Sequence, residues 1–450
     1  MRLIWGTVVK LSEQEGAQRK GYSELFVEVD GRDGQATAIA YPELTGPVAA
    51  GDRVLLNTTA VDLDLGTGGK HFVVARAEDA CAGSAEEAPA TAGSADSTST
   101  AAVHFEEAMQ PEAGHLMKLR YTPHQLNVLC VEAQESPYHK VMETRDSLEG
   151  VPVVCCGLHS QVPLVAAAIK KAMPSLVVGY VMDDSAALAL NLSKILADAT
   201  EVGLIDVTVS TGQAFGGQIE AINLHSGLLA AVHVGGCDVV IAGIGPGLAG
   251  TGTPFGHAGV TQGEIINATA TLGGNPVVCL RMSQADKRDR HQGISHHSLT
   301  ALSRIALAPA TIAAPFMDED CPVRELVDGE LDEMPNPVGH MAFQLEESFY
   351  DEEALRGLKV TTMGRDFTQD PIFFEAAAAA GATAAMIAVM TIEEEASAAI
   401  EDHAAKEAAA AGSGPATVAA DRGAAGGCSA QPSTGQGCKE AGNCPSPCDN

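Results

Sequence analysis

Between residues 115 and 403 the sequence alternates between short, near-continuous apolar runs and segments with helical spacing. The runs are LNVLCVE, VPVVCC, SLVVGYVM, GLIDVTV, DVVIAGI, PVVCLRM, ATIAAPF and LKVTTM. Strands buried on both faces, as in parallel sheets, have this composition. After VPVVCC, apolar residues recur at Val162, Val165 and Ile169, which is the spacing of a helix face. The alternation predicts an α/β domain with a mostly parallel sheet covered by helices.

Eight candidate strands allow two ways of closing such a sheet. One is an open, doubly wound sheet, and the other is an eight-fold β/α barrel, for which about 250 residues is typical. The small residues in the connecting loops favour the open sheet. We therefore predict a doubly wound sheet and keep the barrel as the alternative.

The rest of the chain divides by composition. Residues 1–76 contain short strand-like runs such as LFVEVDG, TAIAYP and DRVLLNTTA, which predict a small β-barrel-like domain. Residues 77–114 are acidic and lack lysine and arginine, so we predict a disordered acidic linker or insertion. The α/β domain then occupies residues 115–403. Residues 404–450 are rich in glycine, alanine and cysteine, which predicts a disordered tail.

Charge and hydropathy restrict the partners. With 27 basic and 58 acidic side chains the formal net charge is −31, which argues against nucleic acid as a partner. The N-terminus has no apolar run of signal-peptide length, and the apolar stretch 376–390 is shorter than the roughly 20 residues of a membrane span. We expect a cytoplasmic protein with no membrane partner. The sequence leaves a homo-oligomer open and identifies no cofactor.

Parallel α/β sheets bind ligands at the carboxyl ends of their strands, so the loops that follow the apolar runs are the candidate site. The loop 243–259 contains seven glycines, which let backbone N–H groups approach an anion. It contains G-x-G-x-x-G, but Thr261 and Glu264 form a T-x-x-E pattern that starts the next helix too late for a dinucleotide fingerprint. We predict an anion cradle, or alternatively a tight structural loop. The cradle residues are Gly245, Gly247, Gly250, Gly252 and Thr253.

A basic island follows the next predicted strand. No lysine or arginine occurs from Ile195 to Leu280, and then Arg281, Arg288 and Arg290 arrive together. If the two loops face each other, these guanidinium groups and the glycine loop would bind one small anion. The alternative is an exposed loop whose charges are solvated or paired with neighbouring aspartates.

His296 and His297 are the predicted catalytic histidines. Ser295 is a natural N-cap, and the positive end of the helix favours neutral imidazoles next to it. A neutral histidine there could act as a base, a hydrogen-bond donor or a metal ligand. Asp183 and Asp184 follow SLVVGYVM and would orient a partner; the simpler interpretation is that they cap the next helix. Because no metal-binding motif is present, we assign no metal ligands from the sequence.

Two segments together resemble a bacterial family, domain of unknown function 3866. They are TGQAFGGQIEAINLHSGLLAAVHVGGCDVVIAGIGPGLAGTGTPFGHAGVTQGEI and RMSQADKRDRHQGISHHSLTALSRIAL. The resemblance extends over residues 1–76 and 115–316, and it implies no activity and no catalytic residues. From the residues we expect a hydrolase or transferase acting on a small phosphorylated or nucleotide-like anion. The alternatives are a non-catalytic small-molecule sensor with a β-barrel interaction domain, and a metal-dependent hydrolase.

Overall fold

The computed structural model describes residues 2–12, 18–19, 21–62, 69–77, 114, 116–120, 124 and 126–411. Residues 1–395 make up one structural unit, and of the second unit, Ala396–Asn450, only the end of helix α11 is described. The predicted linker, except for residues 77 and 114, and the tail beyond residue 411 lie outside the described residues.

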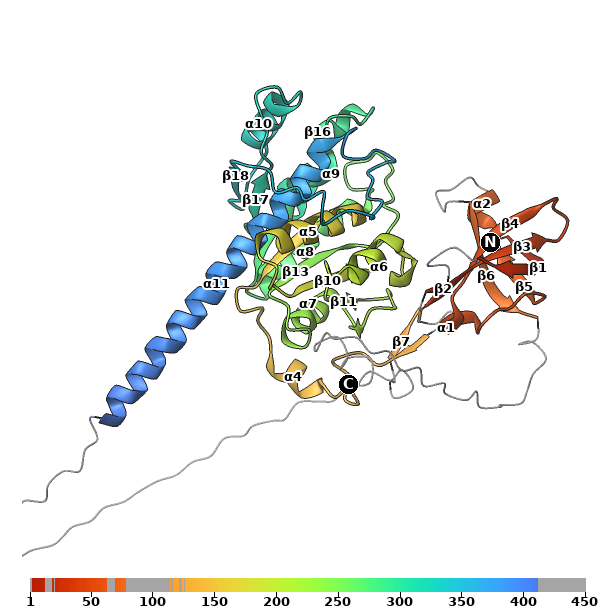
Figure 1. Cartoon of the computed structure of the whole chain (residues 1–450), viewed down its shortest axis with the longest axis horizontal. Helices are drawn as coiled ribbons and strands as arrows, with labels where there is room; N and C mark the ends of the chain where they lie inside the picture. Colours follow the sequence, from red (N-terminus) through yellow and green to blue (C-terminus); the bar gives the residue numbers. More distant parts are fainter. Residues whose placement is uncertain are drawn as a thin grey trace, which may run out of the picture. The chain divides into compact units, whose positions relative to one another are not determined.

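The N-terminal segment forms the predicted small barrel (Figure 1). Five strands close into a ring because β1 pairs with both β3 and β5, while β2 extends the β3 edge. Its core contains Val8, Leu25, Val27, Val54 and Leu56. The elements are β1 (Leu3–Leu11), β2 (Gln18–Arg19), β3 (Tyr22–Val29), β4 (Gln35–Ala40), α1 (Pro42–Thr45), β5 (Arg53–Asn57), α2 (Thr59–Asp62) and β6 (Lys70–Arg76).

The second sheet has eight strands in the order β12-β11-β10-β13-β9-β14-β17-β18, and every pairing is parallel. Its edge strands, β12 and β18, do not pair with each other in the described part of the chain. The open sheet is therefore confirmed and the barrel alternative is wrong. The strands are β9 (Pro152–Cys156), β10 (Val178–Asp183), β11 (Val207–Ser210), β12 (Ile219–Glu220), β13 (Val239–Ile244), β14 (Asn275–Cys279), β17 (Thr311–Ala314) and β18 (Met341–Gln344).

Two of the eight predicted strands do not belong to this sheet. In LNVLCVE the only strand is β8 (Leu126–Val128), which pairs antiparallel with β7 (Leu116–Lys118), and Cys130 forms an isolated parallel bridge to Glu220 at the sheet edge. LKVTTM contains no strand, and Thr362 and Arg365 instead bond each other's backbone in a tight turn. The strands β12 and β18 take their places. They were missed because β12 is two residues long and every residue of β18 is exposed, so neither forms a buried apolar run.

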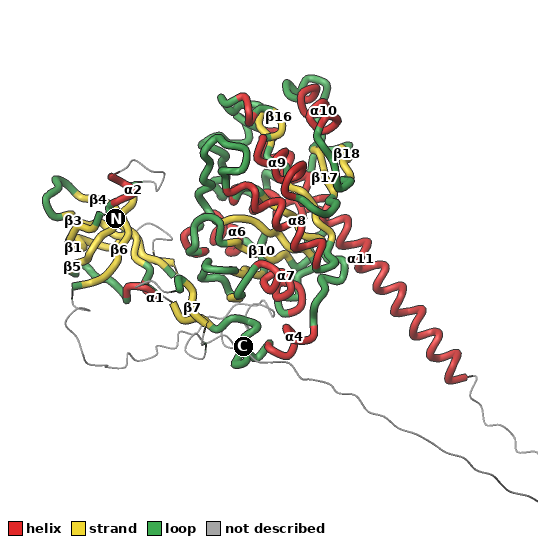
Figure 2. Tube along the Cα trace, turned by 180° about the vertical axis from the view of Figure 1, so that it is seen from behind, coloured by secondary structure: helices red, strands yellow, loops and turns green. Residues whose placement is uncertain are grey.

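Successive residues of the central strands enter two different cores, one on each face of the sheet. In β9, Val153 and Cys155 belong to one core, while Val154 and Cys156 belong to the other. Helices α7 and α8 pack in the first core and α5 and α6 in the second. All four helices are labelled in Figure 1, and Figure 2 shows α6, α7 and α8 from behind. The helices of this domain are α4 (His139–Thr144), α5 (Val162–Ala172), α6 (Lys194–Glu201), α7 (Leu224–His233), α8 (Thr261–Thr271), α9 (His296–Thr300), α10 (Arg324–Glu333) and α11 (Pro371–Ala411).

The apolar stretch 376–390 is part of the long helix α11, which continues past residue 403 to Ala411. The segment Pro371–Glu394 is long and apolar enough to cross a membrane by composition, with a mean hydropathy of 1.8. In the protein, however, 78% of its most apolar window is buried. Ala377, Ala380 and Ala384 are fully buried in the core that also contains α5. The helix therefore packs like the core helix of a soluble domain.

Candidate functional site

The glycine-rich loop follows β13 and the basic loop follows β14, and strand β9 lies between those two strands. The chain runs outward from this centre in both directions, through β10, β11 and β12 on one side and through β14, β17 and β18 on the other. Crevices at such reversals of strand order are the usual ligand sites of open α/β sheets. The two predicted loops therefore leave the sheet close to its switch point without following adjacent strands.

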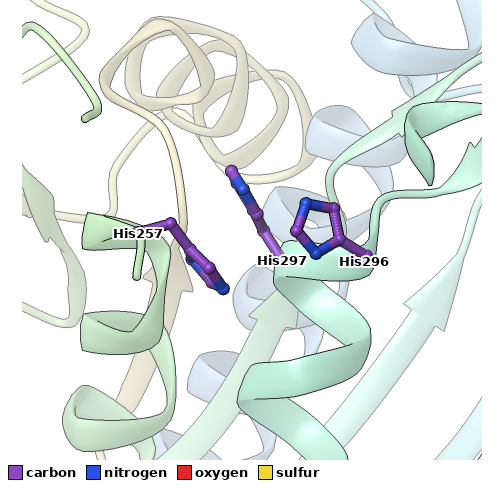
Figure 3. Close-up of side chains that lie close together, drawn as sticks. All are labelled: His257, His296 and His297. Atoms are coloured by element: carbon purple, nitrogen blue, oxygen red, sulfur yellow. The ribbon is translucent and has the colours of Figure 1, made fainter. Parts of the chain in front are cut away.

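Four histidines join the loops, and we call them the histidine cluster: His257, His291, His296 and His297. His257 ends the glycine-rich loop, ahead of a 3₁₀ turn (Ala258–Val260) that leads into α8. The other three lie at or just before the start of α9. The His257 ring stacks on that of His297 with centroids 3.9 Å apart, and the His296 and His297 rings are 4.3 Å apart (Figure 3). His291 lies 5.0 Å from both His296 and His297.

Hydrogen bonds orient these rings. Nε2 of His257 donates to the carbonyl of Pro254 at 3.1 Å, which leaves its Nδ1 without a proton in the neutral ring. Nδ1 of His291 lies 2.7 Å from the hydroxyl of Ser295. Ser295 is the N-cap of α9, as predicted, and accepts from the backbone N–H of His297. Nδ1 of His257 and Nε2 of His296 are buried and have no hydrogen-bond partner among the described residues.

Arg281 is the buried cation of the site, with 8% of its surface exposed. Its Nη1 donates to Nδ1 of His297 at 3.0 Å. Among the described residues it forms no salt bridge, although buried guanidinium groups are usually paired with a carboxylate. Burial and the neighbouring Arg288 lower the pKa of Arg281 to about 10, which still leaves it charged at neutral pH.

All four imidazoles are neutral at neutral pH. Burial is the main cause, and it lowers the pKa of His297 to about 2 and that of His291 to about 3. Burial also lowers the pKa of His257 and of His296, and nearby positive groups such as Arg281 add to the effect. The expected neutrality is thus present, but its cause is desolvation and neighbouring cations rather than the helix end assumed from the sequence.

The other two predicted arginines differ from Arg281. Arg288 forms a two-pronged pair with Asp286 at 2.9 and 2.8 Å, so the pairing alternative describes it correctly. This pair holds the pKa of Asp286 well below its usual range. Arg365 adds a second cation 3.6 Å from Asp286. Arg290 is exposed. Of these three arginines, only Arg281 donates a hydrogen bond to a histidine of the cluster.

Of the predicted cradle residues, only Gly250 lies against the histidine cluster. A Cβ on Gly250 would lie 3.8 Å from the His297 ring, so this backbone runs directly along the cluster. Gly245 instead packs against the carbonyl of Ala187. Gly247 and Gly252 have φ of 92° and 77° with no neighbour within 4 Å of a built Cβ, which makes them exposed turn positions. The Thr253 hydroxyl closes the loop on itself by accepting from the N–H of Gly256.

The two predicted aspartates lie at the end of β10 and bond to other groups. Asp183 accepts from the backbone N–H and the hydroxyl of Ser185, and burial raises its pKa. Asp184 accepts from the N–H of Gln213 at 2.7 Å and so ties two loops together. In the described part of the chain neither carboxylate bonds to the histidine cluster. Neither caps α6, whose N-cap is Ser193.

Sequence reasoning did not assign His257 and His291 to the site. His257 ends a glycine-rich loop and His291 sits inside the basic island, but no regular spacing connects either residue to His296. The expected capping box at Thr261 also does not form, although α8 does begin there. The Thr261 hydroxyl donates to Ser185 instead.

One pocket among the described residues lies elsewhere. It is lined by the β7 strand, by Arg120 and Cys130, and by the loop around Gly212. Its one buried cation, Lys118, is fully engaged, because its Nζ donates to the carbonyls of Ser210 and Ala214 and to the carboxylate of Glu220. With all its donors used, Lys118 offers a ligand no charge there, and the pocket is not the candidate site.

Fold and site together define an open α/β protein whose buried arginine and imidazoles gather at the carboxyl ends of the sheet. The chain belongs to the family described as "Protein of unknown function (DUF3866)", whose model matches residues 37–381. The family resemblance seen in the sequence is confirmed, but its extent differs from the prediction: the match begins at residue 37 rather than residue 1, and it extends beyond residue 316 into α11. No curated protein and no solved structure matches the chain.

Proposed function

We propose that this protein is a hydrolase or group transferase of the bacterial cytoplasm that binds a small phosphorylated or nucleotide-like anion beside the histidine cluster. The observation that carries the proposal is the buried guanidinium of Arg281, which pairs with no carboxylate of the described residues. A buried charge is costly when it is unpaired, and a bound oxyanion would supply the missing partner. Arginine has five N–H donors, of which His297 occupies one, so the others can bind phosphate oxygens.

The surrounding groups fit a reaction on such an anion. The exposed backbone at Gly250 runs beside His297 and would form one wall of the anion site. His296 is the better proton-transfer group, because His297 is held neutral down to a pH of about 2. A bound anion would raise the pKa of His296 towards the range in which an imidazole is an effective acid or base.

The cytoplasmic location has separate support from the cysteines. Six cysteines are free in the described residues, and five of them are buried. Unpaired cysteines in a folded body are typical of a reducing compartment.

Thermal-shift screening tests the proposal, using phosphate, pyrophosphate, nucleotides, sugar phosphates and coenzymes. A ligand present at 100 times its Kd should stabilise the protein by about 2.7 kcal/mol. Arg281→Met should abolish that shift without unfolding the protein, because it removes an unpaired buried charge. Lys287→Met is the matched control, since it removes one exposed charge from the same loop. A shift that survives Arg281→Met, or no shift with any phosphorylated compound, refutes the proposal.

Turnover distinguishes an enzyme from a sensor. With the ligand identified, His296→Ala in an enzyme should lower kcat by about 10²–10⁴, the usual contribution of one acid–base group, while binding persists. If the wild-type protein binds the ligand and converts none of it, the protein is a sensor and the assignment of an enzyme is wrong.

A further inference from the structure

We propose that His257, His296 and His297 bind one transition-metal ion of the Zn²⁺ class. One ring nitrogen from each of the three lies within 4.8 Å of the other two. They come from two elements, the turn before α8 and the start of α9, which approach each other at the carboxyl edge of the sheet (Figure 3). Three histidines with an open fourth position are a known ligand set of catalytic zinc.

Two unpartnered nitrogens point to a ligand at this place. Nδ1 of His257 and Nε2 of His296 are both buried and both lack a hydrogen-bond partner among the described residues. Buried polar atoms in proteins are otherwise almost always satisfied, so two orphans in one cluster call for an explanation. A metal ion bound to both nitrogens would satisfy them together, and His296 would then be a ligand rather than the proton-transfer group of the proposed reaction.

The surroundings of His257 are those of a metal ligand. Its Nε2 donates to the carbonyl of Pro254, which fixes the neutral tautomer that carries a lone pair on Nδ1. Metal-bound histidines commonly hold their second nitrogen in this way, on a backbone carbonyl or a carboxylate. The backbone of the glycine-rich loop thus orients one ligand before any metal arrives.

His297 has to turn in order to join the site. Its ring is stacked on that of His257 with only 12° between the planes, and a metal ion lies in the plane of each ring that binds it. In a tetrahedral zinc site the ligand nitrogens are about 3.3 Å apart, as follows from Zn–N distances of roughly 2.0–2.1 Å. The rings must therefore reorient until their ligand nitrogens, which now lie within 4.8 Å of one another, are about 3.3 Å apart.

Turning His297 releases Arg281. Arg281 donates to Nδ1 of His297, so the neutral ring carries its proton on Nε2. Binding a metal through either nitrogen removes this hydrogen bond, because Nδ1 then holds either the metal or the proton. The freed guanidinium repels the cation until an anion binds between them. Metal and anion should therefore strengthen each other's binding, a coupling that rests on the proposed function.

Cobalt titration of the full-length, metal-free protein tests the metal site. Co²⁺ in a tetrahedral site has strong visible absorption, and calorimetry with Zn²⁺ gives the stoichiometry. We expect one equivalent to bind, with binding lost or weakened at least tenfold in His257→Ala and in His296→Ala. His225→Ala is the matched control, because His225 is an exposed histidine on α7. Binding of Co²⁺ to cysteines instead would be recognised by thiolate-to-cobalt charge-transfer absorption, which a histidine site lacks. The cysteines in question are Cys428, Cys438, Cys444 and Cys448.

The outcomes separate the metal site from the anion proposal. Cobalt binding that is equally tight in wild type, His257→Ala and His296→Ala overturns the metal site. If His257→Ala fails to fold, His296→Ala decides, since His296 is only half-buried. Saturating inorganic phosphate should lower the Kd of Co²⁺ in the wild-type protein. This effect should be at least fivefold larger than in Arg281→Met, and fivefold is the low end of typical coupling between two sites. If Co²⁺ binds but phosphate affects the two proteins equally, the metal site is supported and only the anion proposal is contradicted.

Discussion

Substituting Gly381 by alanine should destabilise the protein, although the same change usually stabilises a helix. Gly381 lies in α11 where this helix meets α5, and a Cβ there would be 2.4 Å from the carbonyl oxygen of Val165 and 3.0 Å from Cβ of Ala168. A backbone oxygen cannot rotate out of the way. Restoring ordinary contact at about 3.4 Å requires the helices to separate by about 1 Å, and such a gap forfeits a quarter to a half of the dispersion energy of the atoms it parts.

The cost of the clash and the gain from replacing glycine together decide whether Gly381→Ala lowers or raises the free energy of unfolding. Overpacking of a well-packed core costs about 1–3 kcal/mol, and replacing glycine in a helix gains about 1 kcal/mol. Because the clash is with the backbone, we expect the cost to be in the upper half of its range. The net loss should be about 1–2 kcal/mol, or a Tm lower by roughly 2–8 °C at 2–4 °C per kcal/mol.

Urea and thermal unfolding measure this change, with Gly329→Ala as the control. Gly329 lies inside α10 and has nothing within 4 Å of a built Cβ. Its replacement should raise stability by about 0.5–1 kcal/mol. The two alanine substitutions should therefore have opposite signs. If Gly381→Ala is as stable as wild type or more so, the close approach of α11 to α5 is not as described.

Two further predictions concern buried ionisable groups. Burial lowers the pKa of His159 to about 4, from about 6.5 when unfolded, so the folded state resists protonation. The unfolding free energy should therefore fall by roughly 3 kcal/mol as the pH drops from about 6.5 to about 4. His159→Gln should lose this pH dependence, and urea midpoints that fall with pH as steeply in the variant as in the wild type would contradict the prediction. Lys118→Met leaves the Glu220 carboxylate without its cation and should cost about 3–5 kcal/mol. Adding Glu220→Gln should restore much of that stability, and a double variant as unstable as the single one would show that the ion pair is not the cause.

The central strands were predictable because burial on both faces leaves a local signal. VPVVCC became β9 for this reason, since its successive side chains enter cores on opposite faces. The same apolar pattern gave a wrong prediction at LKVTTM, where Val360 is buried in irregular backbone and Thr362 is buried at the start of a turn. At β18 the signal was absent, because an edge strand with every residue exposed needs no apolar run.

The candidate site was predictable only as a set of loops. The position of the glycine-rich and basic loops after buried strands follows from the rule for parallel sheets. Which groups in them meet did not follow from the sequence: Arg288 pairs with Asp286 and Arg290 stays exposed, while Arg281 turns inward to His297. These three arginines lie in one polar loop, and only the folded structure decides which is buried, which pairs with a carboxylate and which stays exposed.

The sequence by itself determined a layered α/β body and the N-cap at Ser295, because apolar periodicity and capping act over a few neighbouring residues. Only the tertiary structure decided that His257 meets His296 and His297 beside a buried arginine. That contact depends on β9 being inserted between β13 and β14, and on how the loops that leave these strands pack above the sheet. Strand order and loop packing result from burying the whole sheet, and no local spacing of residues encodes them.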